Sequence, residues 1–269
     1  MDKYLETNRQ NWNDRVSIHA ASRMYDLEGF KAGKNPLHSI ELEELGDVSG
    51  KKLLHLQCHF GMDTLAWARL GAQVTGVDLS DEAIALARSL SEELGIPARF
   101  ICTDIYSLPG ALEDEFDVVY TSYGVLCWLP DLRRWAEVIS GFLRPGGRFY
   151  IVEDHPLANI FEWDEASGTL RIEYPYFPRE EPMYFEPGPS YTDGEGVTSV
   201  GAYEWSHSLG EVVTSLVGAG LEVDYLHEFP ICAWRRFPCM VQGEDGWWRL
   251  PPDVVEIPMT FSLMASKRG

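Results

Sequence analysis

Between residues 51 and 154, short apolar runs alternate with longer segments in which apolar residues recur every three to four positions. Short runs of this kind are typical of buried parallel strands, and the longer segments are typical of helices that pack on a sheet. The predicted strands are 52–56, 73–77, 98–102, 116–120 and 148–152, and the predicted helices are 62–70, 81–94 and 131–143. This alternation predicts an α/β fold with a doubly wound, mostly parallel, Rossmann-like sheet and helices on both faces.

The flanking segments predict additions to this core. Residues 1–45 have helical patterns without strands, and we expect them to form a cap over the edge of the sheet. Residues 156–207 are rich in proline and aromatic residues, which predicts an irregular lid or binding loop without regular elements. Residues 208–269 predict a helix that begins with a capping box at Ser208 and Glu211, then two strands, 221–229 and 258–265, around a second insertion. The prediction is one domain over 1–269, with residues 46–155 as its core and seven strands in its sheet.

Composition and charge narrow the possible partners. The chain has 22 basic and 42 acidic residues, a formal net charge of −20, which argues against binding to nucleic acid or to an anionic membrane surface. Apolar runs are far shorter than a membrane span, and the polar N-terminus lacks a secretory signal. The five cysteines are scattered without a C-x-x-C pair, so we expect reduced thiols, no metal site and a cytoplasmic protein. The sequence predicts no oligomeric state.

The strand ends predict a site for an adenosine group. Ligands of doubly wound sheets bind at the carboxyl ends of the strands, near the point where the strand order reverses. Asp78 ends the second predicted strand, 17 residues after Gly61, and its carboxylate suits the two hydroxyls of a ribose. Asp104 follows the third strand and suits an adenine amino group, with the Ile105 amide facing a ring nitrogen. The loop 57–63 has no glycine-rich start that would hold a pyrophosphate.

In these segments the chain resembles the class I S-adenosylmethionine-dependent methyltransferases. The matching segments are Leu53–Gly61, Ala72–Ser80, Cys102–Ile105, Phe116–Tyr123 and Leu143–Gly147. The chain also looks like a subgroup of that family whose first loop reads Leu-Gln-Cys-His-Phe-Gly. The resemblance implies S-adenosyl-L-methionine as cofactor and S-adenosyl-L-homocysteine as product. It implies cofactor contacts at Gln57, Cys58, His59, Gly61, Asp78, Leu79, Asp104, Ile105, Thr121 and Ser122.

The first loop departs from the family pattern. Where the family has an acidic residue and three glycines, this chain has His55, Gln57 and His59 and keeps only Gly61. Glycine permits positive φ and close approach of the backbone to a ligand, which side chains restrict. The missing acid weakens the usual anchor for the methionine ammonium group, and Asp63 is a candidate substitute. Two alternatives follow: a reshaped but competent site, which the retained aspartates favour, or a site that has lost tight cofactor binding.

Methyl transfer depends mainly on in-line alignment, and a general base is needed only when the acceptor is protonated. His155, after the fifth strand, is the candidate base; the alternative is a hydrogen-bonded histidine that fixes the Pro156 turn. Tyr123 and Trp128 are candidates to line the acceptor site, or they belong to the core. His207 is a third candidate for substrate binding, although a local role at the following helix explains it better.

The acceptor is expected to be a small molecule methylated on O or N. Residues 180–234 contain ten acidic residues and no Lys or Arg, which suits a cationic acceptor or marks a solvated acidic surface. Arg235 and Arg236 suit an acceptor carboxylate, or they are exposed. A non-catalytic S-adenosylmethionine-binding protein is the main alternative. A nicotinamide-dependent oxidoreductase is a weaker alternative because Gly-x-Gly-x-x-Gly is absent.

Overall fold

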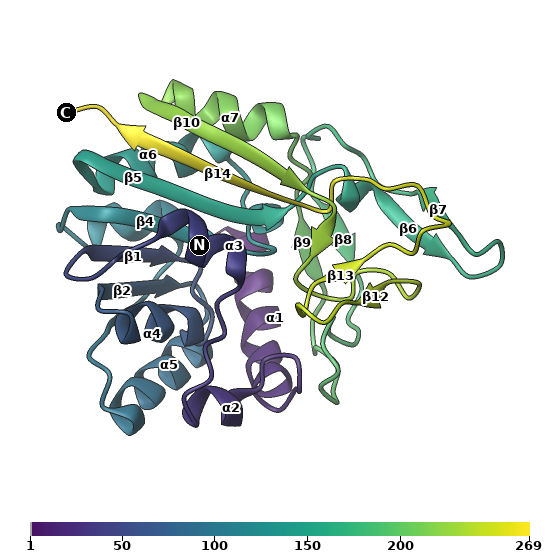
Figure 1. Ribbon diagram of the computed structural model, residues 1–269, viewed down its shortest axis with the longest axis horizontal. Coiled ribbons are helices and arrows are strands. Elements are labelled where there is room, and N and C mark those ends of the chain that lie inside the picture. The colour runs from purple at the N-terminus through teal and green to yellow at the C-terminus, as the bar shows by residue number, and fades with distance from the viewer. Residues whose placement is uncertain (1) are drawn as a thin grey trace.

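A computed structural model describes residues 2–269 and has a seven-stranded sheet at its centre, in the order β10-β14-β5-β4-β1-β2-β3 (Figure 1). The strands are β1 (Lys52–Leu56), β2 (Gln73–Asp78), β3 (Arg99–Cys102), β4 (Phe116–Ser122), β5 (Leu143–Asp154), β10 (Leu221–Phe229) and β14 (Thr260–Lys267). β14 pairs antiparallel with both β5 and β10, and the other pairs are parallel. The predicted doubly wound, mostly parallel sheet is therefore confirmed.

Strand β1 lies inside the sheet, and both of its faces are covered by hydrophobic clusters. Four of its five residues are buried. Leu53 packs with one hydrophobic cluster, while Leu54 and Leu56 pack with the cluster on the opposite face. β1 has β2 on one side and β4 on the other, so the strand order reverses between β1 and β4. This reversal places the expected ligand site at the carboxyl ends of these strands.

Helices cover both faces of the sheet. One face packs against α3 (Ser39–Leu45), α4 (Met62–Arg69) and α5 (Asp81–Leu94), with Trp67 fully buried. The other packs against α6 (Leu132–Phe142), α7 (Leu209–Gly218) and the 3-10 helix η1 (Ile105–Gly110), with Trp135 fully buried. Two further 3-10 turns, η2 (Leu126–Trp128) and η3 (Ala158–Ile160), follow β4 and β5.

The N-terminal segment is helical, as predicted, and consists of α1 (Lys3–Ala20), α2 (Leu27–Lys31) and α3. Helix α1 lies across the carboxyl ends of the strands, between the sheet and the insertions (Figure 1). Asn13 of α1 donates a hydrogen bond to Asp81 at the start of α5. Asn8 of α1 exchanges two hydrogen bonds of 2.8 Å with the backbone of Tyr203 in the first insertion. Helix α1 therefore joins the core to the insertion.

The prediction that the first insertion lacks regular elements is wrong. It contains a hairpin of β6 (Phe161–Asp164) and β7 (Thr169–Ile172), and a pair formed by β8 (Met183–Phe185) and β9 (Ala202–Glu204). Short strands form here because aromatic and aliphatic residues face each other across the ladder, and the prolines lie outside the strands. The second insertion likewise holds a small sheet of β11 (Ile231–Cys232), β13 (Trp248–Arg249) and β12 (Val241–Gln242).

The capping box predicted at α7 is only half formed. The Ser208 side chain accepts a hydrogen bond from the backbone N–H of Glu211, as expected for an N-cap. The Glu211 carboxylate instead contacts His207 Nδ1 at 3.1 Å. Across residues 2–269, no helix combines the length and the apolar character needed to cross a bilayer.

Candidate functional site

The candidate site lies where β1, β2, β4 and β5 end and α1 crosses above them. Its first component is the loop after β1, in which Gln57, His59 and Gly61 have φ of 57°, 50° and 77°. These are left-handed conformations, which cost about 1–2 kcal/mol at residues other than glycine. The loop thus follows a glycine-like path at two positions that carry side chains. Gln57 compensates in part, because its Nε2 donates to the Val125 carbonyl at 2.9 Å.

Asp78, at the end of β2, holds this loop in place. One carboxylate oxygen accepts the backbone N–H of His59 at 2.7 Å, and the other accepts that of Ser80 at 2.9 Å. Burial raises the pKa of the Asp78 carboxyl to about 6. Each oxygen accepts one of these bonds and has a second lone pair for a ligand hydroxyl.

The segment that is predicted to bind adenine follows β3. Asp104 caps η1 by accepting the Ser107 N–H at 3.0 Å, and Ile105 is buried directly after it. Leu79 lies beside this segment, since its carbonyl accepts a long contact of 3.7 Å from the Cys102 thiol. The structure therefore brings Asp104, Ile105, Leu79 and Asp78 to neighbouring strand ends.

His59 connects the first loop to α1 and to the first insertion. Its Nε2 lies 2.9 Å from His19 Nδ1, and His19 Nε2 lies 2.7 Å from the Ser190 hydroxyl. Burial lowers the pKa of both histidines, that of His19 to about 3, so both rings are neutral. The ring of Trp12 packs edge-on at 5.1 Å from His59. No sequence pattern points to His19, because 40 positions separate it from His59.

Asp63 lies in the first turn of α4, at the carboxyl end of β4. Ser122 donates a long hydrogen bond of 3.5 Å to its carboxylate, and burial raises its pKa to about 6. Two other residues that are predicted to contact the cofactor make hydrogen bonds within the protein instead. Thr121 is fully buried and donates to the Leu56 carbonyl at 3.0 Å, and Cys58 is buried with its thiol against the loop backbone.

Tyr123 and Trp128 occupy different surroundings. The Tyr123 hydroxyl donates to Glu41 of α3 at 2.9 Å, and the Tyr123 ring packs edge-on against His38 at 5.4 Å. The Trp128 ring packs edge-on against Trp12 at 5.2 Å, and its Nε1 donates to the Gly124 carbonyl. Trp128 therefore lies with the aromatic residues around the first loop, and Tyr123 joins the sheet to α3.

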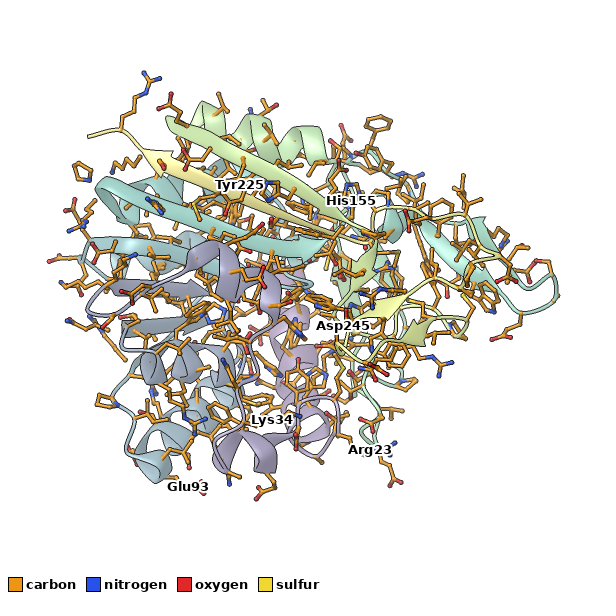
Figure 2. All side chains as sticks on the ribbon, in the orientation of Figure 1. Arg23, Lys34, Glu93, His155, Tyr225 and Asp245 are labelled. Atoms are coloured by element: carbon orange, nitrogen blue, oxygen red, sulfur yellow. The ribbon has the colours of Figure 1, made fainter. Side chains whose placement is uncertain are left out.

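His155 has both ring nitrogens engaged at the junction of the sheet and the insertions (Figure 2). Its Nδ1 accepts the Leu157 N–H at 3.0 Å, and its Nε2 lies 2.8 Å from the Glu228 carboxylate on β10. The side chain is 5% exposed, and burial lowers its pKa. This geometry favours the alternative in which His155 fixes the turn at Pro156 rather than acting as a base.

Replacing His155 by alanine is therefore expected to lower stability and to leave cofactor affinity unchanged. The substitution leaves the partly buried Leu157 N–H without its acceptor, which costs about 1 kcal/mol. Urea unfolding checks the stability. His227→Ala is the control, because His227 also contacts a carboxylate but its side chain is 51% exposed. A variant as stable as the wild type that has lost methyl transfer would restore the general-base role.

His207 also has a local role. Its Nε2 lies 2.7 Å from the Leu129 carbonyl after η2, and its Nδ1 contacts Glu211 of α7. It thereby joins the first insertion to the core, and this arrangement matches the local alternative.

Glu153, near the end of β5, is a residue that sequence reasoning missed. Its buried carboxylate accepts backbone N–H groups of Val125 and Leu126 at 2.7 and 3.2 Å, and also that of Gly124. Burial and the neighbouring Asp154 raise its pKa. It fixes the loop that follows β4, and the signal for it was two adjacent acids at the end of an apolar strand.

The buried carboxyl group of Glu41 is expected to make the stability of the fold decrease as the pH rises. It is fully buried and accepts hydrogen bonds from the His38 N–H and the Tyr123 hydroxyl, and burial raises its pKa from 4.5 to about 8. Because the pKa of Glu41 is higher in the folded chain, its neutral form stabilises the fold, and this stabilisation is complete below pH 4.5. It is lost as the pH rises towards 8, at about 1.4 kcal/mol per pH unit. Glutamine cannot ionise, so the stability of Glu41→Gln relative to wild type should increase from pH 5 to pH 8. Urea unfolding from pH 5 to pH 8 measures the stability of both proteins, and Glu43→Gln, at an exposed residue, is the control. Parallel curves of stability against pH for wild type and Glu41→Gln would contradict the prediction.

The first loop has polar atoms that fit a polar ligand. Gln57 Oε1 and His59 Nδ1 are buried, and neither has a hydrogen-bond partner among residues 2–269. Buried polar atoms without partners are costly, and a bound ligand would satisfy them. No group of three or more potential metal ligands occurs in this described part of the chain.

Comparison with known proteins places this site in a methyltransferase fold. Residues 54–151 match a protein family described as a methyltransferase domain. The ubiquinone biosynthesis O-methyltransferase of Idiomarina loihiensis is 36% identical over 138 residues, which are 48% of this chain and 55% of the relative. That of Saccharophagus degradans is 32% identical over 157 residues, 56% of this chain and 66% of the relative. The chain spans about half the length of the first of these curated relatives.

Solved structures show the same fold. An S-adenosylmethionine-dependent methyltransferase from Mesorhizobium loti superposes with a TM-score of 0.56 at 21% identity, covering 88% of this chain and 100% of that one. The glycopeptide N-methyltransferase MtfA, in complex with S-adenosylmethionine, gives 0.55 at 18% identity, covering 85% and 92%. At these identities the comparison establishes the fold.

Proposed function

We propose that this protein, whose residues 54–151 match the methyltransferase domain, transfers a methyl group from S-adenosylmethionine to O or N of a small molecule. One observation carries the proposal: Asp78 ends β2 beside a first loop whose backbone keeps the left-handed path that glycines would allow. This supports the reshaped but competent site over one that has lost cofactor binding. We further propose that the chain belongs to the subgroup marked by Leu-Gln-Cys-His-Phe-Gly and acts in the cytoplasm, which its five free cysteines support.

The residues at the strand ends divide the work of holding the cofactor. Asp78 would accept the ribose hydroxyls, and Asp104 with the Ile105 amide would bind the adenine edge. Asp63, with its raised pKa and single long hydrogen bond, would face the ammonium group in place of the missing acid. The unpartnered atoms of Gln57 and His59 would complete the amino-acid end. When bound, the cofactor supplies a methyl group on a sulfonium, whose departure leaves a neutral thioether.

The protein's own contribution is enclosure and alignment. Helix α1 and the first insertion lie across the strand ends and are joined through His19, Ser190 and His59. Trp12 and Trp128 add an apolar wall over the first loop. A closed, ordered site of this kind keeps water out and fixes the reacting groups in line, which supplies much of the rate.

The names of relatives support a small-molecule acceptor. The curated relatives are O-methyltransferases and one solved neighbour is an N-methyltransferase, so both acceptor atoms stay open. The net charge of −20 supports a small molecule over nucleic acid. A non-catalytic S-adenosylmethionine-binding protein would share the same site but form no product.

Product formation separates these two possibilities. The purified protein is incubated with S-adenosylmethionine and a panel of small hydroxyl and amine compounds, and methylated products are detected by mass spectrometry. We expect a product that depends on the protein and is lost in Asp78→Ala. Cofactor binding without a product from any compound would favour the non-catalytic alternative.

A further inference from the structure

Arg235 and Arg236 are adjacent in sequence but lie in different environments. Arg235 is exposed and donates to the nearby Pro238 carbonyl. Arg236 is turned inward, with 16% of its side chain exposed, towards the carboxyl end of β5. The two arginines cannot be distinguished from the sequence, and only Arg236 faces inward.

Arg236 has unused hydrogen-bonding capacity. Its Nη1 lies 3.5 Å from Asp154, a long contact for an ion pair. Asp154 is already held by Trp234, whose Nε1 lies 3.2 and 3.3 Å from its two oxygens. The Nε of Arg236 is buried and finds no hydrogen-bond partner in the part of the chain that the structure describes. Such a donor favours a ligand that accepts hydrogen bonds.

Arg15 of α1 forms no ion pair with a carboxylate among residues 2–269. Its Nε donates to the Asn11 side chain at 2.7 Å, and its Nη1 makes a long contact of 3.4 Å with Ser190. The guanidinium also lies over the rings of Trp12, Trp128 and Tyr191, at 5.4, 5.8 and 5.8 Å. Its charge therefore faces an aromatic surface as well as the carboxyl group of Glu204.

A pair of aromatic rings links the two arginines. Tyr191 of the first insertion and Trp234 of the second have their centroids 5.6 Å apart. Arg15 lies 5.8 Å from the Tyr191 ring, and Arg236 lies 5.5 Å from the Trp234 ring. Tyr191 is 40% exposed, so this cluster can be reached from solvent. Three separate segments of the chain meet here beside the end of β5.

Most acidic residues of the first insertion are exposed. Eight of the ten acids in residues 156–207 are in this class: Glu162, Glu165, Glu173, Glu180, Glu181, Glu186, Asp193 and Glu195. Glu204 is half-buried and faces the charges of both Arg15 and Arg236, and burial raises its pKa. Asp154 forms an ion pair with Arg236, whereas Arg15 forms none with a carboxylate among the described residues, so the guanidinium of Arg15 favours an anionic acceptor over a cationic one.

We propose that Arg15 and Arg236 bind a carboxylate carried by the methyl acceptor, whose flat, apolar body packs against Tyr191 and Trp234. This inference rests on the proposed methyltransferase function and specifies the substrate class of that site. A planar guanidinium presents parallel N–H donors that match a carboxylate, and it also stacks on flat rings. Both features occur here at the carboxyl end of β5, next to the candidate cofactor site.

Calorimetric titration tests the proposal. The full-length protein is first titrated with S-adenosylhomocysteine, and the saturated protein is then titrated with benzoate, 2-hydroxybenzoate and 2-naphthoate. Benzamide and benzylamine serve as the neutral and cationic counterparts. We expect at least one carboxylate to bind at least tenfold more tightly than benzamide and benzylamine. We also expect Arg236→Gln to weaken that binding at least tenfold, and Arg15→Gln to weaken it as well.

Arg235→Gln is the matched control because Arg235 is exposed. The affinity of this variant for the carboxylate should equal that of wild type. Arg236→Lys keeps the charge without the fork geometry and should bind less tightly than wild type even if Arg236→Gln fails to fold. The proposal is overturned if benzylamine binds better than the carboxylates, or if none of the carboxylates binds to saturated protein. Equal losses in the Arg235 and Arg236 variants would also overturn it. Failure of the first titration would instead count against the proposed function.

Discussion

Replacing Asp78 by alanine is expected to weaken binding of S-adenosylhomocysteine more than tenfold. In the proposed complex, the carboxylate accepts both ribose hydroxyls while it holds the His59 and Ser80 N–H groups. A hydrogen bond to a charged group contributes about 1.5–3 kcal/mol, and about 1.4 kcal/mol corresponds to a factor of ten. Calorimetric titration of wild type and variant measures the ratio.

Two further variants locate the cause of that loss. Asp78→Asn keeps an acceptor oxygen and the shape of the side chain, so its affinity should fall between those of alanine and wild type. Asp114→Ala removes an exposed acid that pairs with Arg99 at the amino end of β4, and it should bind like wild type. Unchanged affinity in a folded Asp78→Ala protein would refute the ribose assignment.

Replacing Gly61 by alanine is expected to cause a large loss of stability. A Cβ atom at this position would lie 2.8 Å from the Phe100 ring and 3.0 Å from Ala87, and the backbone has φ of +77°. Left-handed strain and overpacking together cost about 2–5 kcal/mol. Urea unfolding of both proteins measures the difference.

Gly95→Ala isolates the steric part of this effect. Gly95 has φ of +62° at the end of α5, and a Cβ atom there would meet nothing within 4 Å. The loss of stability in Gly95→Ala should be limited to the cost of backbone strain, about 1–2 kcal/mol. If Gly61→Ala costs no more than Gly95→Ala, then Phe100 and Ala87 accommodate the new methyl group, and close packing does not determine the glycine.

The core could be predicted from sequence because each element has a local cause. Helix α5 begins and ends where Ser80 and Gly95 indicate, since one caps its N-terminus and the other takes the left-handed conformation at its end. β5 extends beyond the predicted 148–152 because Leu143 pairs with Phe116 ahead of a register shift. The insertion strands escaped prediction because they are two to four residues long, too short for a periodic signal.

The site could be predicted only where its residues follow the strands in order. The positions of Asp78 and Asp104 at neighbouring strand ends could be predicted this way, because Asp78 ends β2 and Asp104 lies two residues after β3. The contact between His19 and His59 and the inward turn of Arg236 arise from tertiary packing between distant segments. The role of His155 depends on Glu228 of β10, 73 positions away, and no local pattern distinguishes a base from a turn-fixing histidine.

The proposed function is tested most simply by calorimetric titration of the purified protein with S-adenosylhomocysteine, with NADH as control. We expect micromolar binding of S-adenosylhomocysteine, about −8 kcal/mol, with one site per chain and no response to NADH. Absence of binding to S-adenosylhomocysteine in the folded protein would contradict the proposed function, because the loop built around Gln57 and His59 would then be a disabled site.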